Sequence, residues 1–308
     1  MKSLLAALLI PLTPACIWID GTTIDGGHVS VGSHGPAYEL RESIDSVPSE
    51  VLLRYALENK ETKIEDDSEL EAVADLLEGK TAKAIESLTK LEKETPAPSR
   101  YSLAANLGTA YELHGDNRNA LKWIKEGIKR NPDAHHGTEW LHQLILETKI
   151  ELEKNPDYLQ GRQVVALPDV IDENTRVTIG DMARPIDQIG DAIFYQLKER
   201  LVFVKPTDPV VASLLYSFAR ITAHTNTVEG GLELLELTRE YGFSDLASIE
   251  ALEKKYERII FIRKLKKYGI ITAGVVAFVL LVVWMYRKKY LFLTQKSYAK
   301  HLNQRSAP

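Results

Sequence analysis

The densest group of side chains that could do chemistry lies at His135, His136, Glu139 and His142. Metalloprotease helices place two histidines four residues apart with the catalytic glutamate between them, and the spacing of His136, Glu139 and His142 does not give that arrangement. We therefore interpret the group as the start of a helix with solvated histidine and glutamate side chains. We expect no bound metal ion there.

Weaker candidates are two glycine pairs and three aspartates: Gly26-Gly27, Gly230-Gly231, Asp181, Asp187 and Asp191. Neither glycine pair is followed by the lysine and the serine or threonine of a phosphate-binding loop. The aspartates lack a defining motif and are more simply explained as a solvated face. The one cysteine, Cys16, leaves none in the rest of the chain, which excludes a disulfide framework, a zinc ribbon and a cysteine nucleophile there. We expect no cofactor and no enzymatic activity.

Composition and charge describe a globular chain with two electrostatic regimes. Of 308 residues, 44% are apolar and 26% charged. Residues 263–308 contain ten Lys and Arg and no acidic residue, whereas residues 17–262 carry a formal charge of −16. Nucleic acid is therefore a disfavoured partner, because phosphates are normally neutralised by an excess of basic residues.

The N-terminus has the parts of a secretory signal. Lys2 precedes an apolar run, 4–10, and a small-residue segment ending at Ala15. We expect a signal peptide over 1–15; the alternative is a buried N-terminal helix. Cys16 after Ala15 resembles the lipidated cysteine of bacterial lipoproteins, although the residues before it depart from that pattern. Lipidation of Cys16 and ordinary cleavage with an unmodified cysteine both stay open.

Residues 269–286 are eighteen uncharged positions. As a helix they reach about 27 Å, enough to span a bilayer, and cationic residues bound them on both sides. A buried core helix is the alternative. With a cleaved signal, residues 17–268 lie outside the cytoplasm and the basic tail 287–308 lies inside, which predicts a single-pass protein of a bacterial cell membrane. Ala273 and Ala277 form a small-residue pair that could bring two such helices together.

Between the two ends the chain is predicted to be all-α with one extended insertion. We expect an irregular arm over 16–47, helical repeats over 48–160, and an extended or hairpin excursion over 161–183 built from strands 163–171 and 175–179. A further helical region follows over 184–243. A helical stalk over 244–268 then leads into the span.

A repeat supports this organisation. Four residues recur at an offset of 36: Gly79, Ala84, Leu88 and Pro96 match Gly115, Ala120, Ile124 and Pro132. Segment 99–134 resembles a tetratricopeptide repeat, because Leu107-Gly108, Tyr111, Ala120, Ile124 and Pro132 follow that template, with Ala104 in place of the opening tryptophan. A degenerate copy follows at Phe218, Ala219, Asn226, Gly231 and Leu235.

The resemblance implies a solenoid of helical hairpins whose first helices form a concave peptide-binding surface. On that surface it would place Ser102, Asn106, Thr109 and Glu112, with the Asn106 amide holding a ligand's backbone; a solvated asparagine is the alternative. The leading functional hypothesis is a membrane-anchored scaffold that presents this groove to a protein or peptide partner. A purely structural subunit of an envelope complex and an envelope hydrolase are the alternatives.

Overall fold

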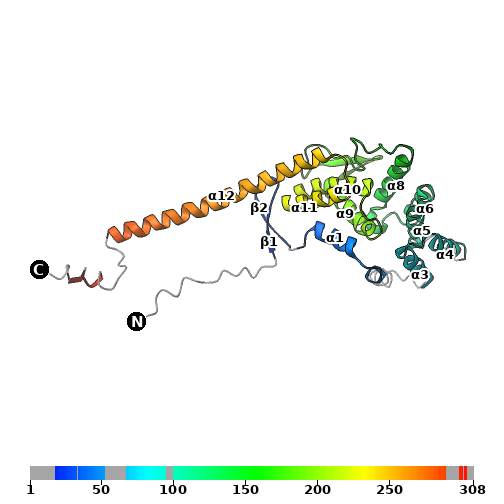
Figure 1. Cartoon of the computed structure of the whole chain (residues 1–308), viewed down its shortest axis with the longest axis horizontal. Coiled ribbons are helices and arrows are strands. Elements are labelled where there is room, and N and C mark those ends of the chain that lie inside the picture. The colour runs from blue at the N-terminus through cyan, green and yellow to red at the C-terminus, as the bar shows by residue number, and fades with distance from the viewer. Residues whose placement is uncertain are drawn as a thin grey trace.

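The computed structural model describes residues 18–32, 34–52, 67–94, 100–288, 298–300 and 302–303. The predicted signal peptide, Cys16 and most of the basic tail lie outside them. The described chain is predominantly helical, as expected. Its last long element is a helix with an apolar C-terminal part (Figure 1).

Helices α3 (Asp67–Leu77) and α4 (Thr81–Glu94) form one helical hairpin, and α5 (Tyr101–Leu113) and α6 (Asn117–Arg130) form the next. Gly79 and Gly115 end the first helix of each hairpin with φ of +77° and +88°, a conformation that costs glycine little. The repeat positions that follow them are fully buried in both hairpins: Ala84, Leu88, Ala120 and Ile124. Three of the four pairs at the 36-residue offset are therefore structurally equivalent, and Pro96 of the fourth pair lies outside the described residues.

Beyond these hairpins come α7 (Ala134–Gly137), α8 (Glu139–Lys154), α9 (Ile186–Leu201), α10 (Pro209–Thr225) and α11 (Val228–Glu240). Helices α10 and α11 pack closely at Gly231, where a Cβ atom would lie 2.8 Å from the Cβ of Ala223. Helices α8 to α11 surround the largest apolar core. The degenerate repeat thus occupies a genuine helical hairpin.

The excursion before α9 contains a hairpin, but with different strands from those predicted. β3 (Arg176–Ile179) pairs antiparallel with β4 (Met182–Pro185), and 163–171 forms no strand. Val164 and Val165 are instead buried against α10, where their backbone groups bond the hydroxyls of Ser213 and Ser217. Three of the four β-branched residues of 163–171 therefore serve the core rather than a sheet: Val164, Val165 and Ile171. The predicted strand over 163–171 is wrong.

The N-terminal arm is not irregular as predicted. β1 (Trp18–Thr22) pairs antiparallel with β2 (His28–Gly32), and α1 (Pro36–Asp45) follows. The backbone N–H and the hydroxyl of Thr22 donate to the Glu229 carboxylate of α11 at 2.8 and 2.6 Å. At Gly21 a Cβ atom would lie 2.6 Å from Thr227 Cγ2. The arm is held in place by contacts with α11 and the residue before it. These contacts join positions far apart in the sequence, so the local pattern does not indicate them.

Helix α12 (Leu246–Arg287) runs for 42 residues without a break. Its first part buries Ile249 and Tyr256 against the helical core. Its most apolar part contains no buried residue and projects away from the other helices (Figure 1). Among the described residues it is the one helix long and apolar enough to cross a membrane. Residues predicted as stalk and as span thus lie on one continuous helix, whereas membrane insertion stays a prediction.

Candidate functional site

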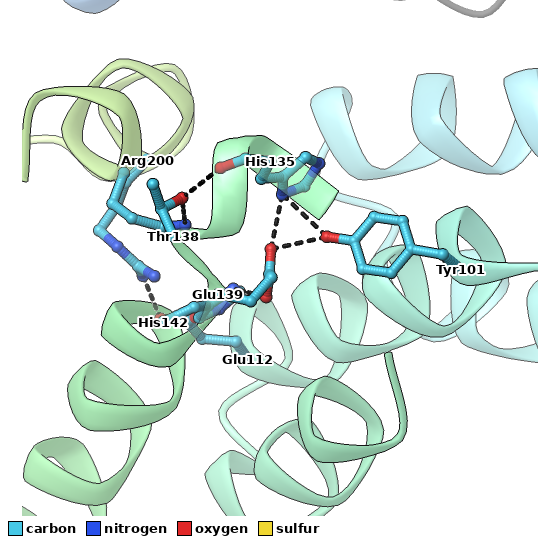
Figure 2. Close-up of polar contacts among 8 residues, drawn as sticks. Tyr101, Glu112, His135, Thr138, Glu139, His142 and Arg200 are labelled. Atoms are coloured by element: carbon cyan, nitrogen blue, oxygen red, sulfur yellow. Dashed lines mark hydrogen bonds and ion pairs between the residues drawn. The ribbon is translucent and has the colours of Figure 1, made fainter. Parts of the chain in front are cut away.

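A buried ionic cluster lies where α5, α8 and α9 meet (Figure 2). The carboxylate of Glu112 on α5 is 4% exposed. It accepts hydrogen bonds from His142 Nε2 at 2.9 Å and Lys149 Nζ at 2.7 Å, both on α8, and from Arg200 Nη1 on α9. One carboxylate thus holds cationic side chains from two other helices.

A second carboxylate, Glu139, continues the cluster on the other side of His142. Its Oε1 lies 2.5 Å from His135 Nδ1 and accepts from the Tyr101 hydroxyl at 2.7 Å, while its Oε2 lies 3.6 Å from His142 Nδ1 (Figure 2). His142 therefore stands between Glu112 and Glu139, which both face its ring nitrogens.

An unusual backbone turn aims His135 at Glu139. His135, His136 and Gly137 have φ of +50°, +56° and +70°, a left-handed conformation that residues other than glycine rarely adopt. The Thr138 hydroxyl donates to the His135 carbonyl at 2.7 Å and accepts from the Gln196 amide of α9 at 3.2 Å. Helix α9 thus supports the turn as well as the ionic cluster.

The environment fixes the charge of these groups. Burial alone would raise the pKa of Glu112, but Arg200, Lys149 and His142 hold it well below the usual range. Burial opposes the charge of Glu139 too, yet His135 and His142 hold its pKa well below normal. Burial lowers the pKa of His142, but its bonds to the two carboxylates outweigh this and raise it above 6.5.

The hydroxyl of Tyr101 completes this picture. Burial and the nearby charge of Glu139 raise the pKa of Tyr101 far above 10, so the hydroxyl keeps its proton and donates it. Both carboxylates are ionised and paired over the neutral pH range, and the Tyr101 hydroxyl stays protonated. Such an arrangement suits holding helices together better than transferring protons.

The cluster lies between two apolar cores. Helix α5 contributes Leu103 and Leu107 to the core of the hairpins, whereas α9 belongs to the larger core around α10. Helix α8 contacts both cores, because Ile145 packs in the larger core and Leu146 packs against helix α6 of the second hairpin. The ionic cluster is therefore the joint between the α3–α6 hairpins and the remainder of the molecule.

The four residues predicted to bind a peptide do not all lie together. Ser102, Asn106 and Thr109 are half-buried and share one side of α5, by their spacing of four and three residues. Glu112 lies instead in the ionic cluster. The Asn106 amide donates to Glu69 Oε1 of α3 at 2.8 Å. Peptide binding by this face stays a prediction.

Asn106 is part of a small polar network that joins α3 to α5. Glu69 is fully buried, and its second oxygen accepts from Arg100 at 2.7 Å. Arg100 thus balances the charge of a buried carboxylate and Asn106 donates a hydrogen bond to it, a role of Asn106 that the sequence did not indicate.

The expectation of solvated side chains at the histidine group is wrong for two members: Glu139 and His142 are buried, because α5 and α9 cover them. Asp181, Asp187 and Asp191 are exposed, as expected. In the part of the chain that the structure describes, no three His, Cys, Asp or Glu side chains are grouped to hold a metal ion.

No protein-family model matches this chain, and no curated protein matches it.

Proposed function

We propose that this protein is a membrane-anchored interaction scaffold whose helical hairpins hold a protein or peptide partner away from the lipid surface. The observation that carries the proposal is the continuity of α12. Its first part is packed into the helical core, its apolar part is exposed, and the α3–α6 hairpins lie at the opposite end of the molecule (Figure 1). A rigid helix would thus display the hairpins at a fixed distance from a membrane.

Close helix packing supports a tetratricopeptide-like solenoid for these hairpins. At Gly108 an added Cβ would lie 2.4 Å from Ile124 Cδ1, so the small residue of the template stands where α5 and α6 touch. The same role falls to Gly231 in the α10–α11 hairpin, against Ala223. In such solenoids the first helices line the partner-binding face.

The proposed binding face is the side of α5 that carries Ser102 and Thr109. The Asn106 amide between them donates to Glu69, so a ligand on this face would chiefly meet Ser102 and Thr109. We place this face outside the cytoplasm of a bacterial cell, with the signal 1–15 removed and the tail 287–308 inside.

A substitution on the binding face tests this proposal. The full chain carrying Thr109→Arg should lose the proteins that copurify with the wild type from solubilised membranes, because a long charged side chain would obstruct the face. The matched control is Lys122→Ala, at an exposed position of the second helix of the same hairpin. Both variants should melt close to the wild type. Unchanged capture by a folded Thr109→Arg protein would contradict the proposed face.

A second candidate, a purely structural subunit, is favoured by the course of α9. Arg200 binds Glu112, and Phe203 packs against the apolar core of the hairpins. Arg200 and Phe203 of this same chain thus cover the end of the proposed binding face where Glu112 lies. If Thr109→Arg and the control capture the same proteins, the structural subunit becomes the better hypothesis and the proposed binding face is rejected.

Topology is tested separately. A reporter active only in the cytoplasm should be active when fused after Pro308 and silent when inserted at Glu173, in an exposed loop. The reverse result would place the helical core inside the cell. Metabolic labelling with a fatty-acid analogue should mark the wild type and not Cys16→Ser if the cysteine carries lipid.

A further inference from the structure

An apolar stripe continues above the proposed span on one side of α12. Phe261, Leu265 and Tyr268 are 65%, 62% and 62% exposed. Their spacing of four and three residues places them on one face of the helix. Large apolar side chains gathered on one exposed face mark a surface that meets a partner.

The opposite face of α12 is already occupied. Arg263 donates to Thr22 Oγ1 at 3.1 Å and also pairs with Asp20, to which Lys267 donates at 2.8 Å. These contacts attach the β1–β2 hairpin to the helix, which agrees with their neighbouring positions in Figure 1. The polar groups of that face are thus satisfied within the protein.

The apolar surface therefore begins earlier on one side of the helix than on the other. On the free side it starts at Phe261; on the hairpin side it starts only after Lys267, at the uncharged segment from Gly269. Eight residues separate Phe261 from Gly269, a step of about 12 Å along a helix about 10 Å across. A boundary this steep fits a helix that meets a flat bilayer surface at an angle.

We propose that the face formed by Phe261, Leu265 and Tyr268 binds the surface of a phospholipid bilayer, so that α12 enters the membrane obliquely with this face toward the lipid. The inference rests on the proposed membrane span. It commits to lipid because the stripe is continuous with that span along the helix. Exposed Lys264 and Lys266 flank it, where their ammonium groups can reach the anionic headgroups.

Hydrophobic length supports the tilt. From Gly269 to Tyr286 the helix measures about 27 Å, slightly less than a bilayer core of about 30 Å. From Phe261 to Tyr286 it measures about 39 Å, and a helix of that apolar length fits the same core when tilted by about 40°. The stripe thus supplies the length that the uncharged segment lacks.

The direction of tilt follows from the charges. If the Phe261 face turns toward the lipid, the hairpin face turns away from it. The carboxylate of Asp20 and its partners Arg263 and Lys267 then stay in water, where their charge costs little. The opposite tilt would press this ionic group into the membrane.

Depth measurements on the full chain test the inference. In a Cys16→Ser background, single cysteines at Leu265, at its neighbours Lys264 and Lys266, and at Val276 in the span would each carry a spin label. The proteins would be reconstituted into vesicles of phosphatidylethanolamine and phosphatidylglycerol. Accessibility to oxygen, which concentrates in lipid, is compared with accessibility to a water-soluble nickel chelate.

The order of depths decides the result. In an upright helix depth rises steadily from 264 through 265 to 266, whereas the proposed tilt places the label at 265 deeper than both neighbours. A lipid-exposed label at 276 with a steady order across the other three overturns the oblique face and leaves the span intact. A water-exposed label at 276 overturns both the span and the inference.

A second copy of the chain is the competing occupant of this face. It would broaden the spectrum of the label at 265 by spin–spin interaction, and dilution with unlabelled protein would remove the broadening. That outcome overturns lipid binding by the face. A further check is the double substitution Phe261→Ser and Leu265→Ser. It should restore the depth order of an upright helix, in which the label at 266 lies deeper than the label at 264.

Discussion

Replacing Glu112 by glutamine should strongly destabilise the joint between the hairpins and the larger core. The substitution keeps the shape of the side chain but removes the charge that Arg200, Lys149 and His142 share. Arg200 is 7% exposed and the Lys149 side chain 18%, so neither cation can move freely into water. Removing one partner of a buried ion pair costs about 3 to 5 kcal/mol.

We take about 3 kcal/mol, the lower end of that range, because the amide oxygen of glutamine can still accept one hydrogen bond. For a helical part of this size the loss corresponds to a fall in melting temperature of roughly 6 to 12 °C. The assay is thermal unfolding of the full chain in detergent, followed by circular dichroism. Glu86→Gln, at an exposed position of α4, is the matched control and should melt within about 2 °C of the wild type.

The pH dependence provides an independent readout. The pKa of His142 is raised in the fold, so its stabilising charge is fully present below pH 6.5 and is lost as the pH rises through the folded value. The pKa of Glu112 is lowered, so its contribution is present above about pH 4.5 and is lost as the pH falls. Glu112→Gln should flatten both slopes.

A double-mutant cycle isolates the pair itself. Arg200→Gln alone should destabilise by a similar amount, and combining it with Glu112→Gln should cost clearly less than the two single changes together, with a coupling of about 1 kcal/mol or more. Additive effects, or a Glu112→Gln protein that melts like the Glu86→Gln control, would refute the reasoning that the cluster holds the joint.

Three further substitutions test separate contacts. Gly108→Val should destabilise the hairpin by about 1 to 3 kcal/mol in the same thermal assay, because the added side chain would meet Ile124. Asn106→Ala should lower stability by about 1 to 2 kcal/mol in chemical denaturation, since the buried carboxylate of Glu69 loses one donor. Asp20→Asn should leave melting almost unchanged but speed hydrogen exchange over 18–32, because it loosens the hairpin from α12.

The features visible in the sequence were those that local rules impose. The recurrence of Gly79 as Gly115 marks a turn that needs positive φ, and the recurrence of Leu88 as Ile124 marks a buried position in each hairpin. Helix α12 was visible because its uncharged run, 269–286, is long enough for a spanning helix and has cationic residues on both sides. Periodicity and turn chemistry are properties of short segments, so a single sequence reveals them.

Elements ordered by distant partners were missed. The hairpin over 18–32 depends on Glu229, more than 200 positions away, which binds Thr22. Segment 163–171 has the composition of a strand, yet Val164 and Val165 are buried in the core beside α10. In both cases tertiary contacts override the local pattern, which a reading of propensity cannot anticipate.

The sequence indicates that Glu112 and Arg200 are buried, but it does not indicate that they pair with each other. Glu112 lies four residues after Gly108, on the side of α5 that approaches another helix, and this spacing alone would have indicated burial. Arg200 likewise continues the buried face of α9 after Ile193 and Leu197. A carboxylate and a guanidinium at core positions of different helices need each other, because either one alone would be a buried charge without a partner. We infer that their pairing favours one way of docking the two cores, whereas an apolar contact would tolerate several.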